Sequence, residues 1–142
     1  MNATMRKFGA PASRIRGYGH WTVLLRPAQV TLGSLILAAH DTATAFSQLS
    51  RASFAELRMV AADLEQALSR AFSYEKLNYL MLMMVDPDVH FHVIPRYSGP
   101  KHFEGREFLD YGWPGPPDLT RPNQTEPPDN FRILAFIASM WG

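Results

Sequence analysis

One short segment of this chain alternates polar and apolar side chains with the two-residue period of a β-strand. Residues 88–96 read Asp-Val-His-Phe-His-Val-Ile-Pro-Arg. Side chains two residues apart share one face of an extended chain, so Asp88, His90 and His92 point one way and the residues between them point into a core. The segment therefore predicts a strand with an apolar back and an acid and two imidazoles in front. The alternative is that both histidines are simply half-exposed polar residues.

The length and composition fit one soluble globular domain. The 142 residues are 46% hydrophobic and 19% charged, which is ordinary for a chain that buries a core. A net charge of +1 argues against a protein built mainly to bind the nucleic-acid backbone. The charged side chains before His40 are nevertheless all basic, and we interpret them either as solvated charges or as a patch for an anionic ligand. They are Arg6, Lys7, Arg14, Arg16 and Arg26.

The chain contains no cysteine, which excludes disulfides, thiolate nucleophiles and cysteine-bound zinc. That composition fits a cytoplasmic protein. No apolar run flanks the basic pair near the N-terminus, and the apolar stretch at residues 35–39 is too short to cross a bilayer. We therefore expect a cytoplasmic, unexported protein with no membrane partner.

The pattern predicts four strands and two helices. Residues 1–18 predict a loosely packed basic arm, and residues 21–25 predict a strand that ends at Arg26-Pro27. Further strands are expected at residues 34–39, 77–84 and 89–94, with a turn at Asp86-Pro87 before the last of them.

The most secure helix begins at residues 53–56, which have the form of a capping box between Ser53 and Glu56. Apolar residues then recur at helical spacing, so the helix is expected to end near Phe72. Prolines make residues 98–130 a long, stiff connection, and residues 131–141 predict a short terminal helix.

The order strand, strand, long helix, strand and histidine-bearing strand resembles the histidine triad family of nucleotide hydrolases and transferases. The resemblance covers residues 20–97 and is most specific at residues 89–96. The three triad positions of the family are Asp88, His90 and His92 in this chain. It implies an α+β fold with an antiparallel sheet of about five strands, one long helix and a short C-terminal helix. Residues 1–97 would form the triad-like domain with its basic arm, and residues 98–142 a proline-rich extension of the same single domain.

The resemblance also implies an activity. His90 would attack the α-phosphorus of a nucleotide and form a nucleotidyl-histidine that water hydrolyses, while His92 contacts the phosphoryl oxygens. The substrates would be nucleoside phosphoramidates or dinucleoside polyphosphates, with no cofactor and no specific nucleic-acid partner. The attacking imidazole needs an acceptor on its other nitrogen, often a backbone carbonyl. The Asp88 carboxylate is a further candidate to orient His90 or His92 and to raise the imidazole pKa.

Four more residues are candidates for nucleotide binding by the same resemblance. Arg26 stands where the family has a ribose-binding acid or amide, and it meets either a phosphate or only solvent. Gly33 matches a family position near the site but is also a common turn residue, and Ser34 stands where several members have another histidine. Arg96 lies on the His90 face if the strand continues past Pro95.

The chain departs from the family before its histidine strand. Residues 83–85 are Met-Met-Val, where the family commonly supplies side-chain donors for the phosphate and the leaving group. A nucleotide-binding protein with weak or no catalysis is therefore the alternative to an enzyme. A metal site is a further alternative, because His90 and His92 with Asp88 offer imidazole and carboxylate ligands. A further ligand has no evident candidate, because His20, His40 and His102 have no obvious claim, so we expect no metal.

The resemblance implies assembly as well. Family members are commonly two-fold dimers, so we expect a homodimer that binds a purine nucleotide. The aromatic, proline-rich tail with Trp113 and Trp141 either wraps a neighbouring subunit or covers its own sheet.

Overall fold

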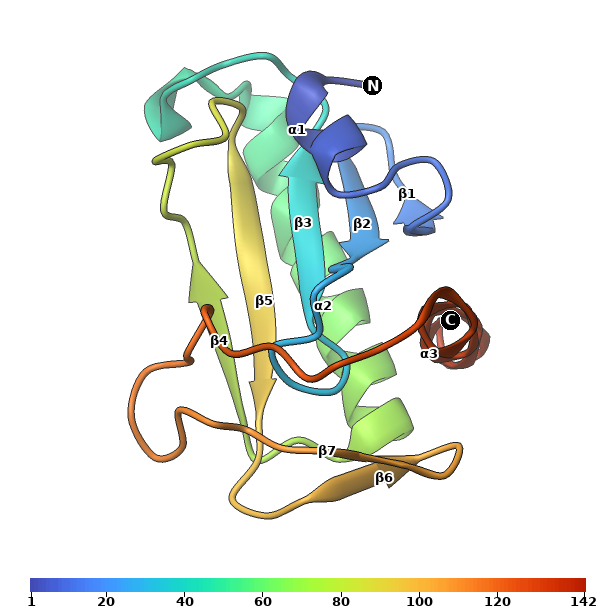
Figure 1. Ribbon diagram of the computed structural model, residues 1–142. Helices are drawn as coiled ribbons and strands as arrows, with labels where there is room; N and C mark the ends of the chain where they lie inside the picture. The colour runs from blue at the N-terminus through green and yellow to red at the C-terminus, as the bar shows by residue number, and fades with distance from the viewer.

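The computed structural model describes all residues from 1 to 142 and is built around one antiparallel sheet of five strands (Figure 1). The strand order in the sheet is β1-β2-β3-β5-β4, and β6 and β7 form a separate hairpin. The strands are β1 (Arg14–Gly17), β2 (Trp21–Leu25), β3 (Leu35–Ala39), β4 (Lys76–Leu80), β5 (His90–Arg96), β6 (Lys101–Phe103) and β7 (Arg106–Phe108). The predicted α+β fold is confirmed.

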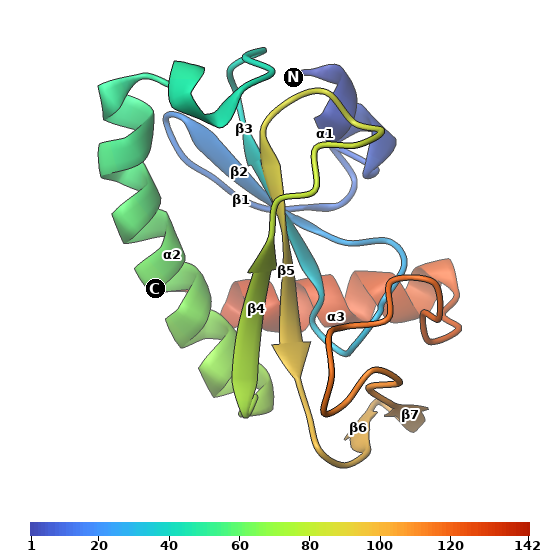
Figure 2. The same ribbon diagram turned by 90° about the vertical axis from the view of Figure 1, so that its left-hand side faces the viewer.

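Helices cover the sheet on both sides. Figure 2 shows the long helix α2 (Arg51–Phe72) on one face of the sheet and the short helix α1 (Ala3–Lys7) on the other. Alternate residues of β2 and β3 pack against α2, which contributes Val60, Leu64 and Leu68 to the same core. The opposite face carries a smaller cluster in which Met5 of α1 covers Leu24. The face beneath α1 is the one on which the histidines of β5 lie.

The N-terminal residues are more ordered than predicted. The prediction of a loose arm at residues 1–18 is wrong, because this segment contains α1 and the edge strand β1. Asn2 caps α1 by accepting from Met5 N at 3.0 Å, and its amide donates to Ala39 O at 2.8 Å. A five-residue helix is not stable alone, so its order comes from tertiary contacts that no local pattern reveals.

The strand predictions were right for β2 and nearly so for β3. The predicted strand at residues 77–84 is wrong at its end, because β4 stops at Leu80 and Met83 takes a φ of 53°. The pairing partner β5 begins at His90, opposite Ala38, and Leu80 already faces His92. β5 runs on through Pro95, which lies beyond the last pair with β3, so its missing N–H breaks no bond on that side.

α2 is capped three residues earlier than predicted. Ser50 is its N-cap, and the Ser50 hydroxyl accepts from Ser53 N at 3.1 Å. The Glu56 carboxylate does not accept from the backbone N–H of Ser53, as a capping box would require. It accepts instead from the backbone N–H of His20 at 2.7 Å. The helix ends at Phe72, as predicted.

The C-terminal residues return to the same core. The prediction of an unbroken connection at residues 98–130 missed the β6–β7 hairpin, and helix α3 (Pro127–Ser139) begins four residues before the predicted 131. Ile133 and Ile137 of α3 are fully buried in the core that α2 covers. Trp141 Nε1 donates to the Tyr18 hydroxyl at 2.8 Å. The extension therefore packs on its own sheet. None of the helices combines the length and the apolar character that crossing a bilayer requires.

Candidate functional site

The two histidines of β5 lie side by side on the sheet face beneath α1. Their neighbours Val89 and Val93 point into the core on the other face, as alternation in a strand requires. The ring centroids of His90 and His92 are 5.2 Å apart, and the Phe8 ring lies 5.8 Å and 5.7 Å from them. The phenyl ring after α1 therefore covers both imidazoles.

The backbone fixes the tautomer of the neutral His90 ring. Its Nδ1 lies 2.7 Å from the main-chain carbonyl of Asp88. A carbonyl oxygen can only accept a hydrogen bond, so Nδ1 carries the proton. In the neutral ring this leaves Nε2 with a free lone pair, which is the form in which an imidazole is a nucleophile.

Arg26 fixes His92 in the tautomer opposite to that of His90. Arg26 Nε donates to Nδ1 of His92 at 3.3 Å. An arginine N–H can only donate, so Nδ1 is unprotonated and the neutral ring carries its proton on Nε2. Burial, and next the positive charge of Arg26, lower the pKa of His92 to about 4. His92 is therefore a neutral hydrogen-bond donor at physiological pH.

Both histidines line a hollow. The residues His90 and His92 are only 2% and 6% exposed. The Nε2 atoms of both rings have no hydrogen-bond partner in the protein. The only side-chain nitrogen or oxygen that is both fully buried and without a partner is Asn130 Oδ1. Both Nε2 atoms therefore keep some contact with solvent. A hollow of about 280 Å³ opens there. It is lined by Lys7, Phe8, Arg26, Leu82, Met83, Met84, Val85, Asp86, His90, His92 and Leu119.

Asp88 serves this site through its backbone and not through its carboxylate. Its Oδ2 accepts from the backbone N–H and the hydroxyl of Thr4, at 3.2 Å and 3.0 Å. The side chain thus anchors the first turn of α1, and the expectation that it orients an imidazole is wrong. A second tie between α1 and the loop before β5 is the ion pair of Lys7 with Asp86, at 2.7 Å.

Gly33 and Ser34 belong to the turn between β2 and β3. Gly33 has a φ of 88°, and a Cβ there would lie 2.9 Å from the Phe72 ring on the α2 side of the sheet. The Ser34 hydroxyl donates to Thr31 O at 2.8 Å and accepts from Thr31 N at 3.0 Å. Both residues shape the turn, and neither lines the hollow.

The Arg96 guanidinium, at the C-terminal end of β5, is bound by other residues of the protein. Arg96 lies four residues beyond His92, roughly 13 Å along a strand, and its Nε and Nη2 bind the Asp110 carboxylate at 2.7 Å and 3.0 Å. Nη1 donates to Asn78, and Nη2 also donates to Gly115 O. The expected role in nucleotide binding is not supported, because this buried ion pair holds the C-terminal extension instead.

Several residues of the hollow were not predicted. Phe8, Asp86 and Leu119 reach it from α1, from the loop before β5 and from the extension. Lys7 was noted only as part of a basic segment. The structure brings no group of three histidine, aspartate or glutamate side chains into a position to hold a metal ion.

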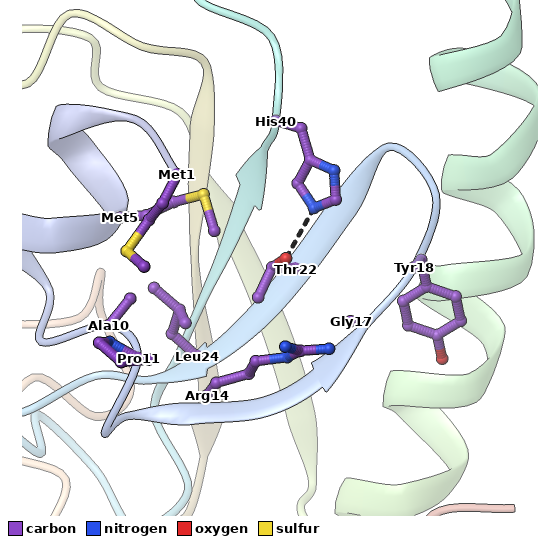
Figure 3. A pocket seen from close by; sticks show the side chains of 10 residues that line it. All are labelled: Met1, Met5, Ala10, Pro11, Arg14, Gly17, Tyr18, Thr22, Leu24 and His40. Carbon is purple, nitrogen blue, oxygen red and sulfur yellow. Dashed lines mark hydrogen bonds between the residues drawn. The ribbon is translucent and has the colours of Figure 1, made fainter.

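A second hollow, of about 300 Å³, lies on the same sheet face on the other side of α1 (Figure 3). Met5 forms part of its wall, and Arg14 extends along β1 toward it. Both ring nitrogens of its histidine, His40, already have partners within the protein. They are hydrogen-bonded to the Thr22 hydroxyl at 2.7 Å and to Gly19 O at 3.1 Å. This hollow holds no second imidazole.

Comparison with known proteins agrees with the fold. Neither the protein-family models nor the curated proteins contain a match to the sequence. Among solved structures, a histidine triad protein from Bradyrhizobium japonicum matches with a TM-score of 0.77 and 17% identity, over 100% of this chain and 97% of that chain. A histidine triad protein from Sinorhizobium meliloti matches with a TM-score of 0.75 and 22% identity, over 98% and 94% of the two chains.

A third structure carries a functional description. It is a hypothetical histidine triad nucleotide-binding protein from Sulfolobus tokodaii, with a TM-score of 0.67 and 15% identity, over 90% of this chain and 82% of that chain. These matches define the class of fold. The chain has the histidine triad fold, and the resemblance seen in the sequence is confirmed at that level.

Proposed function

We propose that this protein is a nucleotide-binding hydrolase of the histidine triad type, which cleaves nucleoside phosphoramidates or dinucleoside polyphosphates at the α-phosphate. The observation that carries the proposal is the pair of opposite tautomers. His90 offers a lone pair on Nε2 because Nδ1 is bound to Asp88 O, and His92 offers an N–H on Nε2 because Nδ1 is bound to Arg26. A nucleophile and a donor thus open side by side into one hollow.

The chemistry follows from these positions. His90 Nε2 attacks the α-phosphorus, a phosphorus–nitrogen bond forms, and the bond to the leaving group breaks. Water then attacks the nucleotidyl-histidine, releases the nucleoside monophosphate and restores the free imidazole. The Nδ1–H group of His90 keeps its hydrogen bond to the Asp88 carbonyl, whose oxygen stabilises the positive ring of the intermediate. His92 Nε2–H donates to a phosphoryl oxygen.

The charges around the hollow support an anionic ligand. Lys7 and Arg26 both line it, and the only acid there, Asp86, is paired with Lys7 at 2.7 Å. A guanidinium matches the geometry of a phosphate. The description of the Sulfolobus tokodaii protein as nucleotide-binding points in the same direction.

A nucleotide-binding protein without useful catalysis is the second candidate. The loop before β5 contributes Leu82, Met83, Met84 and Val85 to the wall of the hollow. Met84 and Val85 are 86% and 81% exposed, and none of these side chains donates a hydrogen bond to a leaving group. Such a wall favours binding over turnover.

One screen separates the two candidates. Adenosine and guanosine phosphoramidates and dinucleoside polyphosphates are offered to the wild type, to His90→Gln and to His102→Gln. His102 is an exposed histidine of the β6–β7 hairpin and serves as the matched control. We expect turnover to fall at least about a thousandfold in His90→Gln and to be unchanged in His102→Gln. Calorimetric binding of nucleoside monophosphates without any turnover would favour the second candidate.

We further propose a cytoplasmic homodimer. β4 is an edge strand of the sheet, so its outer backbone groups are free to pair with another chain. Sedimentation equilibrium tests the assembly: a mass of twice 16.0 kDa is expected, and a mass of 16.0 kDa would contradict it.

A further inference from the structure

Arg26 is held in a fixed position beside His92. It follows β2 directly, and its backbone N–H donates to Ser34 O at 3.0 Å. Its Nη1 donates to Ala28 O at 2.7 Å, while Nε points at Nδ1 of His92. Because the guanidinium is planar, anchoring Nη1 also fixes the direction of the Nε–H bond.

No other neighbour of His92 can do the same work. The charged or titratable groups around it are Arg26, His90, Lys7 and Asp86. Asp86 is the only anion among them, and it is paired with Lys7. His90 uses its Nδ1 on the Asp88 carbonyl. Without Arg26, the His92 ring would be free to exchange tautomers, and only burial and the remaining positive neighbours would oppose a second proton.

We infer that Arg26 is a positioning residue that holds His92 as a neutral Nε2–H donor, opposite in tautomer to the adjacent His90. While Arg26 Nε–H occupies Nδ1, His92 cannot become an imidazolium, because that ion carries a proton on both nitrogens. Arg26 thereby divides the two imidazoles into one nucleophile and one donor.

A neutral His92 also affects which substrates the site can cleave, a point that rests on the proposed function. A neutral imidazole can bind an anionic phosphoryl oxygen, but it is a poor source of a proton for a departing amine. The other pocket side chains beyond the Lys7–Asp86 pair and Arg26 are apolar or His90. The site therefore favours anhydrides, whose leaving group departs as a stable anion, over phosphoramidates, whose amine departs only after protonation.

The chain offers a matched pair of variants for the first test. In Arg26→Gln the side-chain amide nitrogen is bonded to Cδ, as Nε is in arginine, so it can donate to Nδ1 of His92. In Arg26→Met a methyl group, which cannot donate, takes the position of this nitrogen. Arg14→Met is the control, because Arg14 lines the other hollow.

Nitrogen-15 NMR of the histidine rings reads the tautomer directly in the free protein. We expect the Nε2–H form of His92 between pH 5.5 and pH 8 in the wild type, Arg26→Gln and Arg14→Met. We expect a mixture with Nδ1–H or imidazolium in Arg26→Met, with His90 unchanged. An unaltered His92 tautomer in Arg26→Met, or an Nδ1–H form in the wild type, would overturn the inference whether or not the protein turns over nucleotides.

The second readout is the ratio of kcat/KM for diadenosine triphosphate to kcat/KM for adenosine 5′-phosphoramidate. We expect this ratio to fall about tenfold in Arg26→Met at pH 5.5, where His92 can then carry a transferable proton, and to be retained in Arg26→Gln. An equal ratio in all variants would overturn the substrate preference. Absence of turnover with both compounds would refute the proposed function, and the NMR result alone would then decide the role of Arg26.

Discussion

The main-chain carbonyl of Asp88 accepts from Nδ1 of His90 at 2.7 Å, while the carboxylate of the same Asp88 turns away and binds Thr4. One residue thus fixes the His90 ring with its backbone and the covering helix α1 with its side chain. The variant first triad position is therefore compatible with an oriented His90, because a carbonyl is present whatever side chain stands there.

Replacing Asp88 should separate these two tasks. In Asp88→Ala the first turn of α1 loses its acceptor, and the free energy of unfolding should fall by about 1–3 kcal/mol, as for the loss of a hydrogen bond to a charged group. The His90 tautomer should not change, because the carbonyl is still there. Chemical denaturation and histidine NMR measure the two effects. A His90 ring that changes tautomer would show that the carboxylate is needed.

Arg96 should matter for stability and not for nucleotide binding. Its side chain and that of Asp110 are 5% and 1% exposed, so Arg96→Met leaves a buried carboxylate without its partner. We expect a loss of about 3–5 kcal/mol in the free energy of unfolding. The ion pair of Arg106 with Asp129 is the control, because the Arg106 side chain is 45% exposed, and Arg106→Met should have a much smaller effect. Weaker nucleotide binding by a folded Arg96→Met protein would argue against this assignment.

Gly33 should be irreplaceable for steric reasons. Gly33 and Gly105 have similar positive φ angles of 88° and 79°, but a Cβ at Gly33 would lie 2.9 Å from Phe72, whereas nothing lies within 4 Å of one at Gly105. Gly105→Ala should cost only the left-handed strain, about 1–2 kcal/mol. Gly33→Ala should cost about 1–3 kcal/mol more, because the core must give way. Equal losses in thermal or chemical unfolding would show that the contact with Phe72 is unimportant.

The lowered pKa of His92 should make stability depend on pH. The pKa falls from 6.5 to about 4, through burial and the charge of Arg26. Between pH 6.5 and about 4, His92 is protonated in the unfolded chain but not in the folded protein. The free energy of unfolding therefore decreases as the pH falls through this range. Above pH 6.5 this contribution is constant. Urea unfolding across this range should show a steeper loss for the wild type than for His92→Gln, and parallel curves would disprove the assignment.

The sequence predicted the elements whose causes are local. Alternation around His90 and His92 located β5, and helical spacing of apolar residues located α2 as far as Phe72. These patterns arise because one face of each element is buried. The His90–His92 pair needed no more than this strand period to be found.

What the sequence could not predict depends on contacts between distant residues. α1 is stable only against the sheet, and Phe8 reaches the imidazoles across more than eighty positions of the chain. Arg96 shares a face with His90, yet its partner Asp110 lies in a segment with no periodic pattern. The opposite tautomers likewise required the positions of Arg26 and of the Asp88 carbonyl, which only the folded structure supplies.

If His90 is the nucleophile, the protein carries a covalent nucleotidyl group during the reaction, and its mass reveals that group. Protein mixed with diadenosine triphosphate or adenosine 5′-phosphoramidate is quenched in alkali, in which a phosphorus–nitrogen bond to histidine survives, and is weighed intact and after digestion. We expect a gain of one adenylyl group on the peptide that carries His90, absent in His90→Gln and present in His102→Gln. Turnover with an adduct on another residue, or an undiminished adduct in His90→Gln, would contradict it.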